Sequence, residues 1–68
     1  MKTYIVLYRD ESVMAPADPP FGFRCFADSG DHAEEQCANA YPDVDIVWVA
    51  ECRTLRAAYE DYYGSVQP

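Results

Sequence analysis

The segment DSGDHAEEQC, residues 28–37, gathers the side chains most able to do chemistry in this 68-residue chain. It contains the carboxylates at positions 28, 31, 34 and 35 together with His32 and Cys37. Three interpretations fit this composition: a metal or catalytic cluster, the polar start of a helix, or an acidic surface that binds a basic partner. Each makes different demands on the rest of the sequence.

A metal site needs several ligands at matched spacing, and the sequence offers few. His32 has no second histidine to join it, and Cys25, Cys37 and Cys52 form no C-x-x-C pair of the kind found in zinc sites. Cys37 also falls on the apolar side of a predicted helix, where a free cysteine behaves as a small hydrophobe. We therefore expect no metal and no cofactor.

Catalysis is also disfavoured. A nucleophilic Cys or Ser would need His32 as its base, but His32 falls in the first helical turn, where the helix dipole disfavours the protonated ring. Carboxylate catalysis requires one buried and one solvated acid in a cleft, whereas these acids fall at helix starts and on exposed helix faces. The sequence contains no glycine-rich phosphate loop. We expect that the protein is not an enzyme.

The binding interpretation accounts for more of the acidic residues. In a helix, positions 31, 34 and 35 share one face with neighbours about 5–6 Å apart, which is close to the spacing of phosphates along a DNA strand. Acidic residues just outside this helix, on the second helix and on the loop would extend the row, and an exposed tyrosine would add contact area. The predicted partner-binding residues are Asp28, Asp31, Glu34, Glu35, Asp43, Asp45, Glu60, Asp61 and Tyr63.

Helix capping is the competing explanation for part of this row. Asp31 and Glu34 have the spacing of a capping box, with Ser29 as a rival cap, and both acids favour the positive helix start by about 0.3–1 kcal/mol each. Capping does not account for Glu35, Asp43 or the other acids beyond the helix. We therefore assign capping to individual residues and binding to the group.

The overall charge is consistent with a basic partner. Twelve Asp and Glu against five Lys and Arg give a net charge of -7, which repels nucleic acid and anionic membranes and steers the protein toward basic surfaces. Acidity that only keeps the protein soluble is the simpler alternative. The odd, widely spaced cysteines and the absence of an apolar leader or spanning segment predict a cytoplasmic protein with reduced thiols.

The hydrophobic pattern predicts one α+β domain over residues 1–68, in the order β-β-α-β-α. The expected strands are 2–9, 21–27 and 44–51, and the helices are 31–41 and 53–64, the second ending at Gly64. A proline-rich loop covers 9–22 and a frayed tail 65–68. We expect a single-layer, three-stranded, mostly antiparallel sheet under one layer of helices, with a parallel crossover between the second and third strands left open.

Alternation assigns side chains to faces. The first strand is apolar on both faces, which predicts a central strand or one covered on both sides. In the third strand, Ile46 and Trp48 should share one face and Val47 and Val49 the other. The tyrosines divide into core positions 41, 59 and 62 and exposed positions 8 and 63.

Three stretches carry a resemblance to a known class of protein. HAEEQCANAYPDVDIVWVAE, with the tyrosine-rich start MKTYIVLYR and the tail AAYEDYYG, resembles small acidic phage and prophage proteins, among them anti-CRISPR proteins directed at bacterial type I surveillance complexes. The resemblance implies a phage-encoded inhibitor that binds the basic DNA-binding surface of such a complex and blocks target DNA, by acidic DNA mimicry. No position matches a defined binding motif, so no residue role carries over.

A different class of function also fits the composition. The chain is short enough to be a structural or regulatory module that forms a homodimer through an open sheet edge, with its acidity serving only solubility. We expect a monomer, because the inhibitor interpretation accounts for more of the carboxylates.

Overall fold

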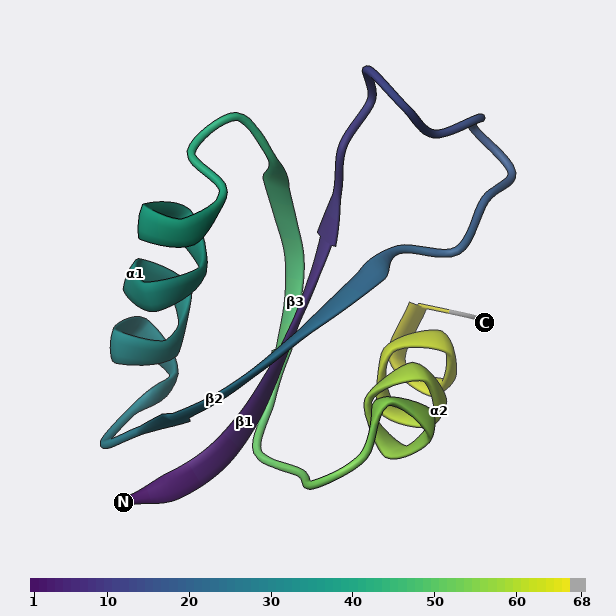
Figure 1. Cartoon of the computed structure of the whole chain (residues 1–68). Coiled ribbons are helices and arrows are strands. Elements are labelled where there is room, and N and C mark those ends of the chain that lie inside the picture. The colour runs from purple at the N-terminus through teal and green to yellow at the C-terminus, as the bar shows by residue number, and fades with distance from the viewer. Residues whose placement is uncertain (67–68) are drawn as a thin grey trace.

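A computed structural model describes residues 1–66 of the chain and shows the predicted order of elements (Figure 1). The first two strands have the predicted bounds, the third is shorter, and both helices are displaced by one or two residues. The elements are β1 (Lys2–Arg9), β2 (Phe21–Ala27), α1 (Gly30–Ala40), β3 (Asp45–Ala50) and α2 (Leu55–Val66).

The sheet is antiparallel throughout, with the strand order β2-β1-β3. β1 pairs with β2 from Lys2 opposite Ala27 to Tyr8 opposite Phe21, and with β3 from Ile5 opposite Ala50 to Arg9 opposite Asp45. β2 and β3 therefore run in the same direction but are separated by β1, so the parallel pair left open by the sequence does not form. Both outer strands have one unpaired edge within the part of the chain that the structure describes.

The two helices cover opposite faces of the sheet (Figure 1). Tyr4 and Val6 of β1 point toward α1, where they form a buried cluster with Cys37. Ile5 and Leu7 point the other way, toward Ala58 and the rest of α2. The prediction of one helical layer is wrong, because the two apolar faces of β1 each need a cover. The prediction that β1 is central and covered on both sides is confirmed.

A β-bulge changes the faces of β3. Leu7 pairs with Trp48 but the next residue of β1, Tyr8, pairs with Ile46, so Val47 is an extra residue in the ladder. Val47 and Trp48 both pack on the α2 side, whereas Ile46 and Val49 pack on the α1 side. The predicted simple alternation of this strand is therefore wrong.

The loop between β1 and β2 covers residues 10–20 and is held by several side chains, among them Arg9, Asp10 and Asp18. The Arg9 guanidinium forms an ion pair with Glu11 at 2.9 Å and donates to the carbonyls of Ala15, at 3.0 Å, and Asp18, at 2.6 Å. Met14 is buried beneath the loop. The predicted loop bounds of 9–22 were too wide, because Arg9, Phe21 and Gly22 belong to the sheet.

α2 begins after Thr54, whose Oγ1 accepts from the Ala57 amide at 3.1 Å. The helix continues through Gly64 to Val66, so the predicted stop at Gly64 is wrong. Ser65 and Val66 are helical rather than frayed, and the rest of the predicted tail lies outside the described residues.

Candidate partner-binding surface

The start of α1 is capped by Ser29 rather than by Asp31. Ser29 has extended backbone geometry, and its Oγ accepts from the His32 amide at 3.2 Å. Asp31 lies inside the first turn, so the predicted capping box with Glu34 does not form. Because neither carboxylate serves as a cap, both remain free for contacts outside the helix, while Asp31 still gains from the positive end of the helix dipole.

His32 takes part in local structure. Its Nδ1 lies 3.3 Å from the Asp28 amide, which donates to it, and its Nε2 lies 3.4 Å from the Gln36 side-chain amide. Gln36 in turn donates to the Phe26 carbonyl at 2.7 Å. The imidazole therefore links the start of α1 to the end of β2, and its ring contacts are with amides rather than with a thiol or hydroxyl.

The carboxylates are unevenly distributed along the chain. Residues 25–50 contain six of the twelve acids and none of the five Lys and Arg residues. Within residues 1–66 every ion pair involves acids outside this segment, namely Glu11, Glu51 and Glu60. The six acids of the segment are exposed, except Glu34, which is half-buried. They are Asp28, Asp31, Glu34, Glu35, Asp43 and Asp45, and we call them the α1 acidic surface.

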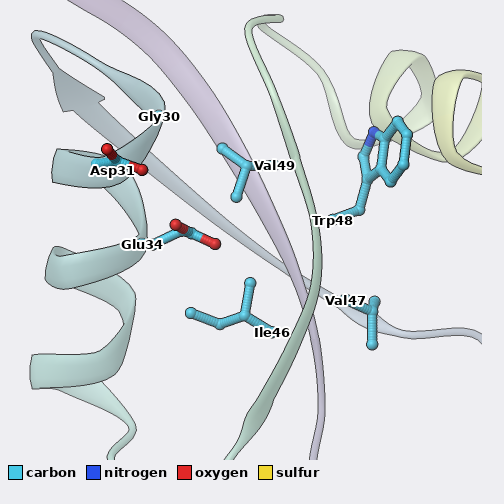
Figure 2. A pocket seen from close by; sticks show the side chains of 7 residues that line it. All are labelled: Gly30, Asp31, Glu34, Ile46, Val47, Trp48 and Val49. Carbon is cyan, nitrogen blue, oxygen red and sulfur yellow. The ribbon is translucent and has the colours of Figure 1, made fainter.

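Two of these carboxylates border a hollow between α1 and the edge strand β3 (Figure 2). The hollow has a volume of about 380 Å³ and is open to solvent. Figure 2 shows the Glu34 side chain directed from α1 toward β3, with Asp31 closer to the helix start. The Ile46 and Val49 side chains are directed toward α1 and form an apolar floor, whereas those of Val47 and Trp48 point to the other side of β3. The hollow therefore joins negative charge to hydrophobic surface. The other lining residues are Gly30, Ile46, Val47, Trp48 and Val49.

The three predicted site residues on α2 do not continue this surface. Glu60 pairs with Arg56 at 3.2 Å, and Asp61 accepts a hydrogen bond of 2.8 Å from the Trp48 indole. Tyr63 is exposed, as predicted, and stacks on Tyr59 at 6.0 Å between ring centroids. Because α2 lies on the opposite face of the sheet from α1, β3 separates these residues from the α1 acidic surface.

The aromatic side chains differ in part from the prediction. Tyr41, predicted in the core, is 45% exposed and stacks on Tyr8 at 5.2 Å. Tyr8, predicted to be exposed, is half-buried against the α1 cluster. Tyr41 is the C-cap of α1, and its backbone amide donates to the Cys37 carbonyl. Because it follows the helix, its ring covers the edge of the core and does not fill it.

The thiols are poorly placed for nucleophilic chemistry. Cys25 and Cys37 are buried in the α1 cluster, and burial raises the pKa of both thiols. Burial likewise raises the pKa of Cys52, whose thiol donates to the Thr54 carbonyl at 3.5 Å. All three therefore favour the neutral, unreactive thiol. Within residues 1–66, no three His, Cys, Asp or Glu side chains gather in a way that could hold a metal ion.

A second surface, which the sequence did not indicate, lies beside α2. Phe26, Leu55 and Tyr63 are all exposed. An open, largely apolar hollow of about 530 Å³ lies along one side of α2, between Leu55, Tyr59 and Tyr63. The Arg56–Glu60 pair borders the hollow, and the Arg24 guanidinium lies 6.0 Å from the Phe26 ring. This surface is apolar and nearly neutral, in contrast to the α1 acidic surface.

Comparisons with protein-family models, curated proteins and solved structures find no significant match to this chain. In the part of the chain that the structure describes, neither helix has the length and apolar character needed to cross a bilayer.

Proposed function

We propose that the protein is a non-enzymatic inhibitor that binds the basic, nucleic-acid-binding surface of a host protein complex and excludes DNA from it. The favoured target is a bacterial type I CRISPR surveillance complex, following the resemblance to acidic phage inhibitors. The partner is thus a protein, and the inhibitor itself binds neither nucleic acid nor membrane.

One observation carries this proposal: the six carboxylates of the α1 acidic surface have no cationic partner within residues 1–66. A cluster of like charge raises the free energy of the compact state through self-repulsion. Ser29 already caps α1, and the core packs through Ala33 and Cys37, so folding does not require these acids. A basic partner supplies the missing counter-charge.

The physical role of the surface is first to accelerate encounter. Complementary charge raises association rates well above the neutral range of about 10⁵–10⁶ M⁻¹s⁻¹ at low salt, and the effect falls as salt is added. The apolar floor of the hollow beside Glu34 then provides short-range contact that salt does not screen. Lys and Arg side chains that normally bind DNA phosphates would bind these carboxylates instead.

The test is a paired charge reversal measured as affinity for the purified surveillance complex. We expect E34K/E35K to weaken binding by at least tenfold while leaving the circular dichroism unchanged and the thermal unfolding temperature no lower than that of wild type, because the reversal relieves repulsion among the carboxylates. The matched control is E51K/E60K, which makes the same change in net charge but alters only surface pairs with Lys2 and Arg56. Equal binding by E34K/E35K and wild type rules out the electrostatic mechanism; equal weakening by both variants shows that net charge, not position, matters.

The alternative function, a homodimeric interaction module, is favoured by a different observation. Phe26, Leu55 and Tyr63 leave apolar surface exposed on β2 and α2, away from the α1 acidic surface. A homodimer through this side would keep the α1 acidic surfaces of the two copies apart. Light scattering after gel filtration separates the two: a monomer at all salt concentrations supports the inhibitor, and a salt-insensitive dimer supports the module.

A further inference from the structure

The two unpaired edges of the sheet differ in what covers them. At the β2 edge, the Gln36 amide donates to the Phe26 carbonyl at 2.7 Å, and Arg24 stands in the middle of the strand. The Gln36 side chain already occupies this edge, and the charge of Arg24 lies on the edge strand. Both features disfavour pairing with another strand. At the β3 edge, no hydrogen bond from another part of residues 1–66 covers the backbone of Val49.

The register determines which backbone groups of β3 face outward. The Phe26 carbonyl accepts from the Gln36 side chain, and from this we infer that it points away from β1. In an antiparallel sheet, the N–H and C=O of one residue in a central strand both point to the strand on one side, and those of the next residue both point to the strand on the other side. Thr3 pairs with Phe26, so the backbone N–H and C=O groups of Thr3, Ile5 and Leu7 point toward β3. The backbone groups of their partners Ala50 and Trp48 point toward β1. The N–H and C=O of Val49, which lies between them, therefore point outward at the free edge.

The bulge limits how much of this edge is regular. The extra residue Val47 interrupts the ladder, so the regular part is Trp48–Ala50. A strand added there would make few backbone hydrogen bonds, and its affinity would depend on side-chain contacts. The hollow beside the edge supplies them, since Asp31 and Glu34 border it and apolar side chains form its floor (Figure 2).

We propose that the free edge of β3 at Trp48–Ala50 receives an extended segment of the partner protein that carries Lys or Arg. Pairing with Val49 sets the position of the segment, and Asp31 and Glu34 bind its basic side chains. This inference rests on the proposed function, because it takes the partner surface to be basic. A second copy of this chain is the less suitable occupant, since edge-to-edge pairing would bring two sets of unpaired carboxylates together.

A synthetic peptide tests the inference directly. The probe is an acetylated, amidated eight-residue peptide of alternating Lys and Val, titrated into ¹⁵N-labelled full-length protein at low salt. We expect saturable shifts at Gly30, Asp31 and Val49, and at least fivefold slower hydrogen exchange of the Val49 amide. A peptide with Glu in place of Lys should cause neither change.

Matched variants identify the carboxylates that matter. D31N/E34Q should weaken binding of the Lys-Val peptide by at least fivefold, whereas E11Q/E60Q removes two exposed charges outside the α1 acidic surface and should have little effect. All four side chains are outside the buried clusters, so both variants should fold. Equal weakening by both, shifts spread along α1 without protection of Val49, or protection at the β2 edge instead would overturn the inference.

The peptide experiment and the test of the proposed function can fail independently. If E34K/E35K loses binding to the surveillance complex while the peptide leaves Val49 unprotected, the inhibitor proposal stands and the strand-pairing inference fails. If the peptide protects Val49 but the complex does not bind the protein at all, the edge is a docking site and the proposed target is wrong.

Discussion

The indole Nε1 of Trp48 donates a 2.8 Å hydrogen bond to the carboxylate of Asp61, and this contact ties the edge strand β3 to α2. Trp48 also packs against Tyr62 at 5.8 Å between centroids. Asp61 therefore has a structural partner, unlike the acids of α1. This relationship separates two groups of carboxylates that appear equivalent in the sequence.

Removing the acceptor at Asp61 should lower stability without lowering partner binding. We expect D61A to reduce the free energy of unfolding by about 1 kcal/mol, since a hydrogen bond to a charged acceptor contributes about 1.5–3 kcal/mol and exposure reduces this. D61N keeps an acceptor oxygen and should lose less. Urea unfolding followed by Trp48 fluorescence measures both variants, and unchanged stability of D61A would show that the bond contributes nothing.

The cap of α1 offers a second test of structure. S29A should lower the free energy of unfolding by about 1 kcal/mol because it removes the acceptor for the His32 amide, whereas S29D should retain most of it. D31A should cost less, because Asp31 contributes only through the helix dipole. Thermal unfolding of the three variants compares them. A larger loss for D31A than for S29A would assign the cap to the wrong residue.

Gly22 lies where Leu55 at the start of α2 approaches β2 closely. A Cβ at position 22 would clash with Cδ1 of Leu55, so the Leu55 side chain must shift from its rotamer. We expect G22A to cost about 1 kcal/mol, the order of an off-rotamer side chain, and to cost nothing in an L55A background. A double-mutant cycle in urea measures the coupling. Equal costs of G22A in both backgrounds would show that Leu55 is not the constraint.

Thiol burial predicts how stability depends on pH. The pKa values of Cys25 and Cys37 are raised in the folded protein, mainly by burial, so unfolding releases thiols that ionise more readily. Above the unfolded value of about 8.5, the unfolded chain binds fewer protons than the folded one. This stability is therefore fully present below pH 8 and declines as pH rises toward the folded pKa values.

Two measurements check this prediction. Urea unfolding at pH 7.5 and pH 9.5 should show a lower midpoint at the higher pH, and the difference should shrink in C25A/C37A. At pH 8, a thiol reagent should label Cys25 and Cys37 at a rate that follows opening of the fold. Rapid labelling of both in the native protein would contradict the burial that raises their pKa.

Much of the fold is predictable because β1 and β2 carry unambiguous patterns. Their bounds agree with the structure, and the two apolar faces of β1 correctly indicate a covered central strand. Two apolar faces on a central strand also require a cover on each side of the sheet, which the prediction of one helical layer did not take into account. The bulge was not predictable, because Ile46 to Val49 are all apolar and a one-residue shift leaves no trace in such a run.

The candidate site was predictable only in part. The sequence locates the acids of α1 but cannot distinguish Ser29 from Asp31 as the cap, since both fit the rules and packing of Ala33 and Cys37 sets the helix start. The role of Asp61 depends on a contact with Trp48, thirteen residues away on another element. The exposed apolar side beside α2 arises because that helix packs on β1 and β3 and leaves part of β2 uncovered.

The central claim is that the α1 acidic surface takes the place of DNA on a basic protein surface, and competition with DNA tests it most directly. Labelled target duplex is bound to a type I surveillance complex and titrated with wild type, E34K/E35K and E51K/E60K at 50 and 300 mM salt. We expect wild type and E51K/E60K to prevent DNA binding and E34K/E35K to need at least tenfold more protein for the same effect. Higher salt should weaken inhibition by the wild type. Undiminished DNA binding at saturating wild type, or equal inhibition by E34K/E35K, would contradict it.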